Sequence, residues 1–127
     1  MGAVGLTGNI PENLFANCPD VRRFTSTFSR CKGLTGEIPE KLFEKCSKVT
    51  DFYSCFSGCT SLTGKIPEKL FENCTNVTTF SFTFSSCTKL TGNAPELWNR
   101  KNVTSGYDCF YGCTNLTNYA DIPSTWK

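Results

Sequence analysis

The sequence predicts an α/β solenoid, a stack of about four coils that combines a parallel β-sheet with short helices. Leu-Thr-Gly recurs every 28 residues, at Leu6, Leu34, Leu62 and Leu90, and a repeat of about 20–50 residues is typical of stacked units. Pro-Glu recurs at the same period, and Phe-x-x-Cys recurs in both halves of most coils. Because one unit alone has too little core to fold, we expect each coil to bury its apolar side chains against the next.

The 127 residues are expected to form one domain. It consists of coils 6–33, 34–61, 62–89 and 90–115 and a C-terminal cap, 116–127, and the fourth coil is the shortest. Met1-Gly2-Ala3 comes just before the first coil and lacks the basic and apolar regions of a signal peptide. We therefore expect a C-terminal piece of a longer protein.

The Pro-Glu segments predict a short helix in each coil, at 39–46 and its equivalents. Proline suits the first helical position because its missing N–H would have no partner there. Glutamate in the first turn faces the positive end of the helix dipole. We therefore interpret the repeated glutamates as helix-start residues rather than as an acidic ligand site: Glu12, Glu40, Glu68 and Glu96.

The Val-to-Phe segments predict parallel strands at 21–28, 49–56, 77–84 and 103–110. Thr and Phe are favoured in strands, and the alternation of Phe80, Phe82 and Phe84 indicates one buried face. The alternate positions then face outward in two columns. The first column is Thr25, Tyr53, Ser81 and Tyr107, and the second is Thr27, Cys55, Thr83 and Cys109.

Seven of the nine cysteines end the repeated Phe-x-x-Cys motif of the two half-coils and form two ladders, 18/46/74 and 31/59/87/113. Neighbours in a ladder are expected about 5 Å apart. That distance permits a disulfide, but buried reduced thiols fit as well and are favoured, because free Cys is among the most buried residue types. We expect no metal site. Cys55 and Cys109 lie on an outward column and are the expected reactive thiols.

Two parts of the repeat resemble known families. L-T-G-x-I-P-x-x-L is similar to the plant-type leucine-rich repeat. F-S-G-C-T-S-L-T at 56–63, with V-T-x-F-x-x-x-F-x-x-C, resembles the BspA-type repeats of bacterial surface proteins. D-I-P-S-T-W-K at 121–127 resembles the ends of such proteins in gut Bacteroidetes and their phages. The resemblance implies a right-handed, leucine-rich-repeat-like solenoid on an extracellular or cell-surface protein that adheres to host or matrix partners.

The fourth coil departs from this pattern. Ala94 replaces Ile, Gly106 replaces Phe, and 97–102 lacks Phe-x-x-Cys. Terminal repeats must differ from the others to shield the stack. We therefore expect the fourth coil to begin a cap.

The composition argues against several function classes. The net charge of +2 is too balanced to indicate nucleic-acid binding, and no apolar run approaches the roughly 18 residues of a membrane span. The chain has no histidine, the commonest general base, and nothing pairs a nucleophile with a base. We expect neither an enzyme nor a cofactor.

The predicted function is therefore a non-catalytic binding or adhesion module of a cell-surface or phage tail protein, with a protein or glycan partner. Tyrosine is enriched at recognition surfaces, and the expected ligand contacts are Arg23, Tyr53, Tyr107 and Tyr111. Two alternatives stay open: a purely structural spacer or virion component, and ice binding through the threonines, whose columns Tyr, Asp, Arg and Cys interrupt.

Overall fold

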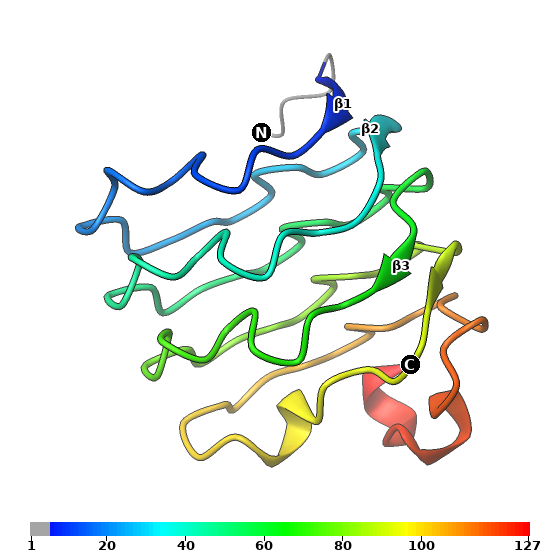
Figure 1. The fold of residues 1–127 in the computed structure, drawn as a ribbon. Helices are drawn as coiled ribbons and strands as arrows, with labels where there is room; N and C mark the ends of the chain where they lie inside the picture. Colours follow the sequence, from blue (N-terminus) through cyan, green and yellow to red (C-terminus); the bar gives the residue numbers. More distant parts are fainter. Residues whose placement is uncertain (1–5) are drawn as a thin grey trace.

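The computed structural model describes residues 6–127, whose coils lie one above another (Figure 1). On one side, β1 pairs with β2 and β3 with β4, both in parallel, and a single parallel pairing of Gly36 with Leu62 joins the two pairs. Residues about one coil apart in the sequence are therefore neighbours in space. The strands are β1 (Thr7–Asn9), β2 (Gly33–Thr35), β3 (Gly64–Lys65) and β4 (Leu90–Thr91).

The glycine of Leu-Thr-Gly directly follows two of these strands, β2 and β4. Gly36 directly follows β2 and has a φ of +73°, which lies outside the strand region and is easily adopted only by glycine. A Cβ added there would lie 2.6 Å from Oδ1 of Asn9 on the preceding coil. The positive φ therefore favours glycine at this bend, and a side chain there would also displace the amide of Asn9.

The strands predicted on the opposite side, at 21–28, 49–56, 77–84 and 103–110, are wrong. The coils pair there at single positions only. Beyond each pairing the chain makes a series of tight turns, described below with the surface that they form. The pairings are Arg23 with Asp51, Asp51 with Thr79, and Thr79 with Ser105.

The short helices predicted at 39–46 and its equivalents in the first three coils are also wrong. In the second coil the N–H groups of Leu42, Glu44 and Cys46 each donate to the carbonyl oxygen three residues earlier, at 3.2, 3.1 and 3.0 Å. Because only every second residue makes such a bond, the segment is a run of turns. No helix dipole therefore accounts for the repeated glutamates of these coils. The described helices are all 3₁₀: η1 (Leu97–Asn99), η2 (Tyr119–Asp121) and η3 (Ser124–Trp126).

Phenylalanines of successive coils stack in columns through the core, as the repeat predicts. In one column the ring centroids of Phe28 and Phe56 are 5.4 Å apart, those of Phe56 and Phe84 are 5.4 Å apart, and Phe110 follows at 5.8 Å. Two parallel columns interlock edge to face beside it. These columns are Phe24/Phe52/Phe80 and Phe15/Phe43/Phe71. Aromatic stacking thus adds to the apolar burial that holds the coils together.

The ladder cysteines of the second to fourth coils form no disulfide, and their thiols hydrogen-bond to the preceding coil. Sγ of Cys59 donates to the carbonyl oxygen of Phe28 at 3.0 Å, and Sγ of Cys87 donates to that of Phe56 at 3.0 Å. The same Phe28 carbonyl accepts the N–H of Cys31 in its own coil. Cysteine therefore acts as a small apolar residue with a weak donor, and the ladder joins adjacent coils.

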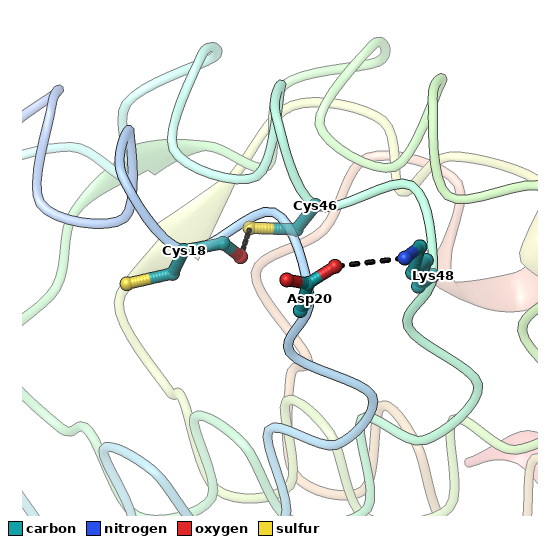
Figure 2. A network of polar contacts seen from close by, with 4 residues as sticks. All are labelled: Cys18, Asp20, Cys46 and Lys48. Atoms are coloured by element: carbon teal, nitrogen blue, oxygen red, sulfur yellow. Dashed lines mark hydrogen bonds and ion pairs between the residues drawn. The ribbon is translucent and has the colours of Figure 1, made fainter.

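The other ladder is shown in Figure 2, where Sγ of Cys46 donates to the carbonyl oxygen of Cys18 at 3.6 Å. Beside it, Nζ of Lys48 donates to Oδ1 of Asp20 at 2.7 Å, again between adjacent coils. The hydrogen bond and charge of Lys48 lower the pKa of Asp20. Both groups are exposed, so this ion pair contributes little to stability.

Residues 116–127 close the C-terminal end of the stack. Trp126 takes the place of the missing Phe at Gly106, and its ring lies against those of Phe110 and Trp98, with centroids 6.4 and 6.1 Å away. The N–H of Phe110 donates to the carbonyl oxygen of Trp126 at 2.8 Å, as it would to a further coil. The side-chain amide of Asn118 bonds to both the N–H and the C=O of Ala94. These contacts cover the end of the fourth coil.

Arg100 replaces the ladder cysteine in the fourth coil. Sγ of Cys74 donates to the carbonyl oxygens of Phe43 and Cys46, and the guanidinium of Arg100 donates to those of Phe71 and Cys74, the equivalent pair one coil later. The guanidinium carbon also lies 5.6 Å from the ring centroid of Phe80. A charged side chain thus ends the thiol ladder while satisfying the same acceptors.

Candidate binding surface

The turns after each single pairing form a surface that we call the turn face. Along it the backbone N–H groups alternate between two kinds of acceptor. The N–H of Ser26 donates to the carbonyl oxygen of Tyr53 on the next coil, at 2.8 Å, whereas that of Thr27 donates three residues back to Phe24, at 3.2 Å. Inter-coil pairing and tight turns therefore share one segment.

This alternation gives a side-chain pattern with a period of four, two inward and two outward. In the second coil Phe52, Cys55, Phe56 and Cys59 are buried, and residues 53, 54, 57 and 58 face outward. A strand would alternate singly. The spacing of Phe24, Thr27, Phe28 and Cys31, repeated in later coils, was the sequence signal for this pattern.

The turns require an unusual backbone conformation on the outward side. A type II turn needs φ above zero at its third residue, which favours glycine, and Gly58 and Gly112 have φ of +75° and +78° there. Non-glycine residues take the equivalent outward positions elsewhere, with φ between 50° and 64°. They are Ser26, Arg30, Ser54, Phe82, Ser86 and Asp108.

The prediction that Cys55 and Cys109 face outward and are reactive is wrong. Both side chains are fully buried, because the turn directs the fourth residue of each set inward. Burial raises the pKa of both thiols well above its usual range, so they stay protonated, and the thiolate is the reactive form.

Three aromatic side chains form a continuous row on the turn face, which we call the aromatic strip: Tyr53, Phe82 and Tyr107. The ring of Phe82 packs edge to face against that of Tyr53 and against that of Tyr107, with both centroid distances 5.5 Å. Tyr53 is 42% exposed and Tyr107 is 59% exposed. The strip therefore links two tyrosines that the sequence places two coils apart.

The structure thus corrects the placement of Phe82, which was predicted to be buried with Phe80 and Phe84. Its side chain is only half-buried, and its φ is +59°. A bulky residue with this φ is a backbone outlier, and such strain tends to occur at functional sites. Period-two alternation pointed Phe82 inward, so sequence reasoning missed it.

Hydrogen bonds hold the backbone around the strip. Oδ1 of Asp51 accepts the N–H of Tyr53 at 2.7 Å, and Oγ1 of Thr79 accepts the N–H of Ser81 at 3.1 Å. Ser81 takes the tyrosine position in the third coil and is buried between its neighbours. These two hydrogen bonds hold the backbone beside the strip in the second and third coils.

Two of the four predicted contact residues, Tyr53 and Tyr107, belong to this strip. Tyr111 is 54% exposed on the same coil as Tyr107, but it has no ring contact with the strip. Arg23 is exposed and pairs through its backbone with Asp51. The structure therefore connects the tyrosines through Phe82 and leaves Arg23 and Tyr111 at the edges.

The grooves recorded in the structure include two on the Pro-Glu side, between the third and fourth coils. One, of about 420 Å³, is lined by residues that include Lys65, Glu68 and Asn118. A second, of about 490 Å³, shares Glu68, Pro95 and Glu96 with it. In residues 6–127 no group of three or more acidic or cysteine side chains is placed to hold a metal ion.

The fold and this surface define a class: a stack of turn-linked coils with a cysteine ladder inside and an aromatic strip outside. The chain belongs to the family described as Mycoplasma protein of unknown function, DUF285, whose model matches residues 22–126. No curated protein and no solved structure matches the chain. Within the described residues no helix is both long and apolar enough to cross a membrane.

Proposed function

We propose that the chain is a non-catalytic binding module that presents its turn face to a protein or glycan partner. The aromatic strip carries this proposal, because it is exposed, held in place and built with a strained residue. Rigid aromatic side chains give contact area at low entropic cost. The proposal also includes the right-handed, leucine-rich-repeat-like solenoid class, the BspA-type resemblance and a place on a cell or phage surface.

Several features of the chain support a binding role over catalysis. It has no histidine, and burial raises the pKa of thiols such as Cys55 and Cys59, which disfavours the nucleophilic form. Stacked coils offer an extended surface on which outward residues vary while the core repeats. Binding by the outward side chains of the turn face fits this division.

The test is a screen of the purified chain on arrays of glycans and extracellular-matrix proteins. Tyr53→Ala with Tyr107→Ala is the test variant, and Leu14→Ala, which removes an exposed apolar side chain from the first coil, is the control. We expect a partner that binds the wild type and the control but not the double variant. Equal binding by the double variant would exclude the strip, and a wild type that binds nothing would favour a structural spacer.

A further inference from the structure

Three exposed arginines lie along the first coil. Arg22 and Arg23 stand at the single pairing that precedes the turn face, and Arg30 lies within its turns. Arg23 pairs with Asp51, whose carboxylate holds the backbone of Tyr53, and a Cβ on Gly58 of the second coil would lie 3.4 Å from Cα of Arg30. The arginines therefore continue the same surface at its N-terminal end.

None of these three guanidinium groups forms an ion pair within residues 6–127, where the one ion pair joins Lys48 and Asp20. Two acidic groups lie near these arginines. Asp20 pairs with Lys48 and is also influenced by the charge of Arg22, and Asp51 accepts the N–H of Tyr53, so three arginines and Lys48 outnumber two carboxylates. Asp108 lies three coils away, at the Tyr107 end of the strip. The arginine end of the turn face is thus positive, with donors available to a ligand.

Resting on the proposed function, we propose that the partner of this surface is an anionic glycan. Arginine binds carboxylate and sulfate groups through paired N–H donors, and the three exposed arginines give the first coil several such donors. Aromatic rings offer flat apolar surfaces to the C–H faces of sugar rings. The glycan would lie along the stack axis. Its acidic groups would contact the arginines of the first coil, and its sugar rings would lie over Tyr53, Phe82 and Tyr107.

Two observations favour a glycan over an acidic protein. The strip is a single row of three rings, whereas protein interfaces of standard size bury about 800 Å² on each partner around a packed centre. Hydroxyl groups surround it, with exposed Thr25 and Ser105 and half-buried Ser57. A narrow aromatic row with hydroxyl neighbours matches a linear, hydroxylated ligand better than a broad apolar one.

The test measures binding of the whole chain to alginate, which carries carboxylates, to dextran sulfate, which carries sulfates, and to neutral dextran. The arginine variant carries Arg22→Gln, Arg23→Gln and Arg30→Gln. The control variant carries Lys41→Gln, Lys45→Gln and Lys69→Gln. It removes the same amount of positive charge from exposed residues on the Pro-Glu side. Tyr53→Ala with Tyr107→Ala is the strip variant.

We expect at least one anionic glycan, and not neutral dextran, to bind the wild type. Because three exposed charge contacts are lost together, the arginine variant should bind about tenfold more weakly, while the lysine control stays within about twofold. The strip variant should also lose affinity. Which polymer binds identifies the anionic group.

Other results overturn the proposal in separable ways. Equal loss in the lysine control means binding by net charge alone, and retained affinity in the arginine variant excludes the arginine group. If the strip variant loses binding only to neutral dextran or to a matrix protein, the proposed function stands and the proposal of an anionic glycan partner is wrong. If the strip variant keeps every ligand, both proposals fail.

Discussion

The indole of Trp126 fills the space that the missing side chain of Gly106 leaves in the Phe24/Phe52/Phe80 column. A Cβ on Gly106 would lie 2.0 Å from Cζ2 of Trp126. The fourth coil therefore omits a phenylalanine so that the C-terminal segment can supply a larger ring. The two residues form one structural unit, although 20 positions separate them in the sequence.

Gly106→Ala is accordingly expected to destabilise the protein through this contact. Overpacking costs about 1–3 kcal/mol, and Trp126→Ala alone should cost about 3–5 kcal/mol. Urea unfolding of both single variants and the double variant checks this. In the Trp126→Ala background the cost of Gly106→Ala should largely disappear, and additive costs would show that the two residues are not coupled.

Phe56→Ala should remove a central member of the Phe28 column. Its ring stacks on Phe28 and Phe84 at 5.4 Å each and is fully buried. The loss should be about 3–5 kcal/mol, large against the stability of a small domain. Thermal unfolding followed by circular dichroism measures it, and an unchanged melting temperature would contradict the core assignment.

Phe82→Asn should weaken binding without lowering stability. Asparagine adopts a positive φ more easily than phenylalanine, so the free energy of unfolding should stay the same or rise by up to about 1 kcal/mol. Binding through the strip should weaken, because the ring that joins Tyr53 to Tyr107 is gone. A large loss of stability would show instead that Phe82 is a core residue.

The rate of alkylation should differ between half-buried and buried cysteine thiols. Cys18 is half-buried and the other cysteines are buried, so iodoacetamide at about pH 8 should modify Cys18 first, because reaction requires an accessible thiolate. Mass spectrometry of peptides locates the label, and Cys18→Ser should remove the early product. Early labelling of Cys55 or Cys109 would contradict their burial and support the outward orientation that the sequence predicted.

Stability should fall at alkaline pH. Burial raises the pKa of Cys59, Cys74 and Cys113 from 9.0 to about 12. A raised pKa stabilises the fold fully below pH 9 and progressively less above it, because the unfolded thiols ionise there first. Each such thiol should lower the free energy of unfolding by about 1.4 kcal/mol per pH unit between these values.

Urea unfolding in the presence of a reductant, compared at about pH 8 and pH 10, measures this slope. Cys59→Ala is the matched variant, and its slope should be smaller by the contribution of one thiol. A pH-independent stability across this range would mean that the thiols are solvated in the folded chain.

Much of the fold could be predicted from the sequence repeat. The 28-residue period placed Phe28, Phe56 and Phe84 in one column, and the irregular fourth coil, with Gly106 for Phe, indicated the cap. The period says which residues are stacked, but not how the chain runs between them. Turns and strands both bury Phe24 and Phe28, and only the intervening Thr27 distinguishes a period of four from a period of two.

The candidate site was predictable only in part for the same reason. Tyr53 and Tyr107 face outward under either pattern, so they were found. Phe82 and Cys55 lie where the two patterns disagree, so both were placed on the wrong side. Pro39 and Glu40 favoured a helix locally, but the N–H groups of this segment close turns at every second residue instead.

Within residues 6–127 the C-terminal end of the stack is covered and the first coil is more exposed, and this asymmetry gives unfolding a direction. Leu14 in the first coil is 42% exposed, whereas its counterpart Leu42 is 2% exposed. Each coil is held mainly by its immediate neighbours, so opening should start at the first coil and travel toward Trp126. Amide hydrogens of that coil should exchange earliest, and those beneath the indole last.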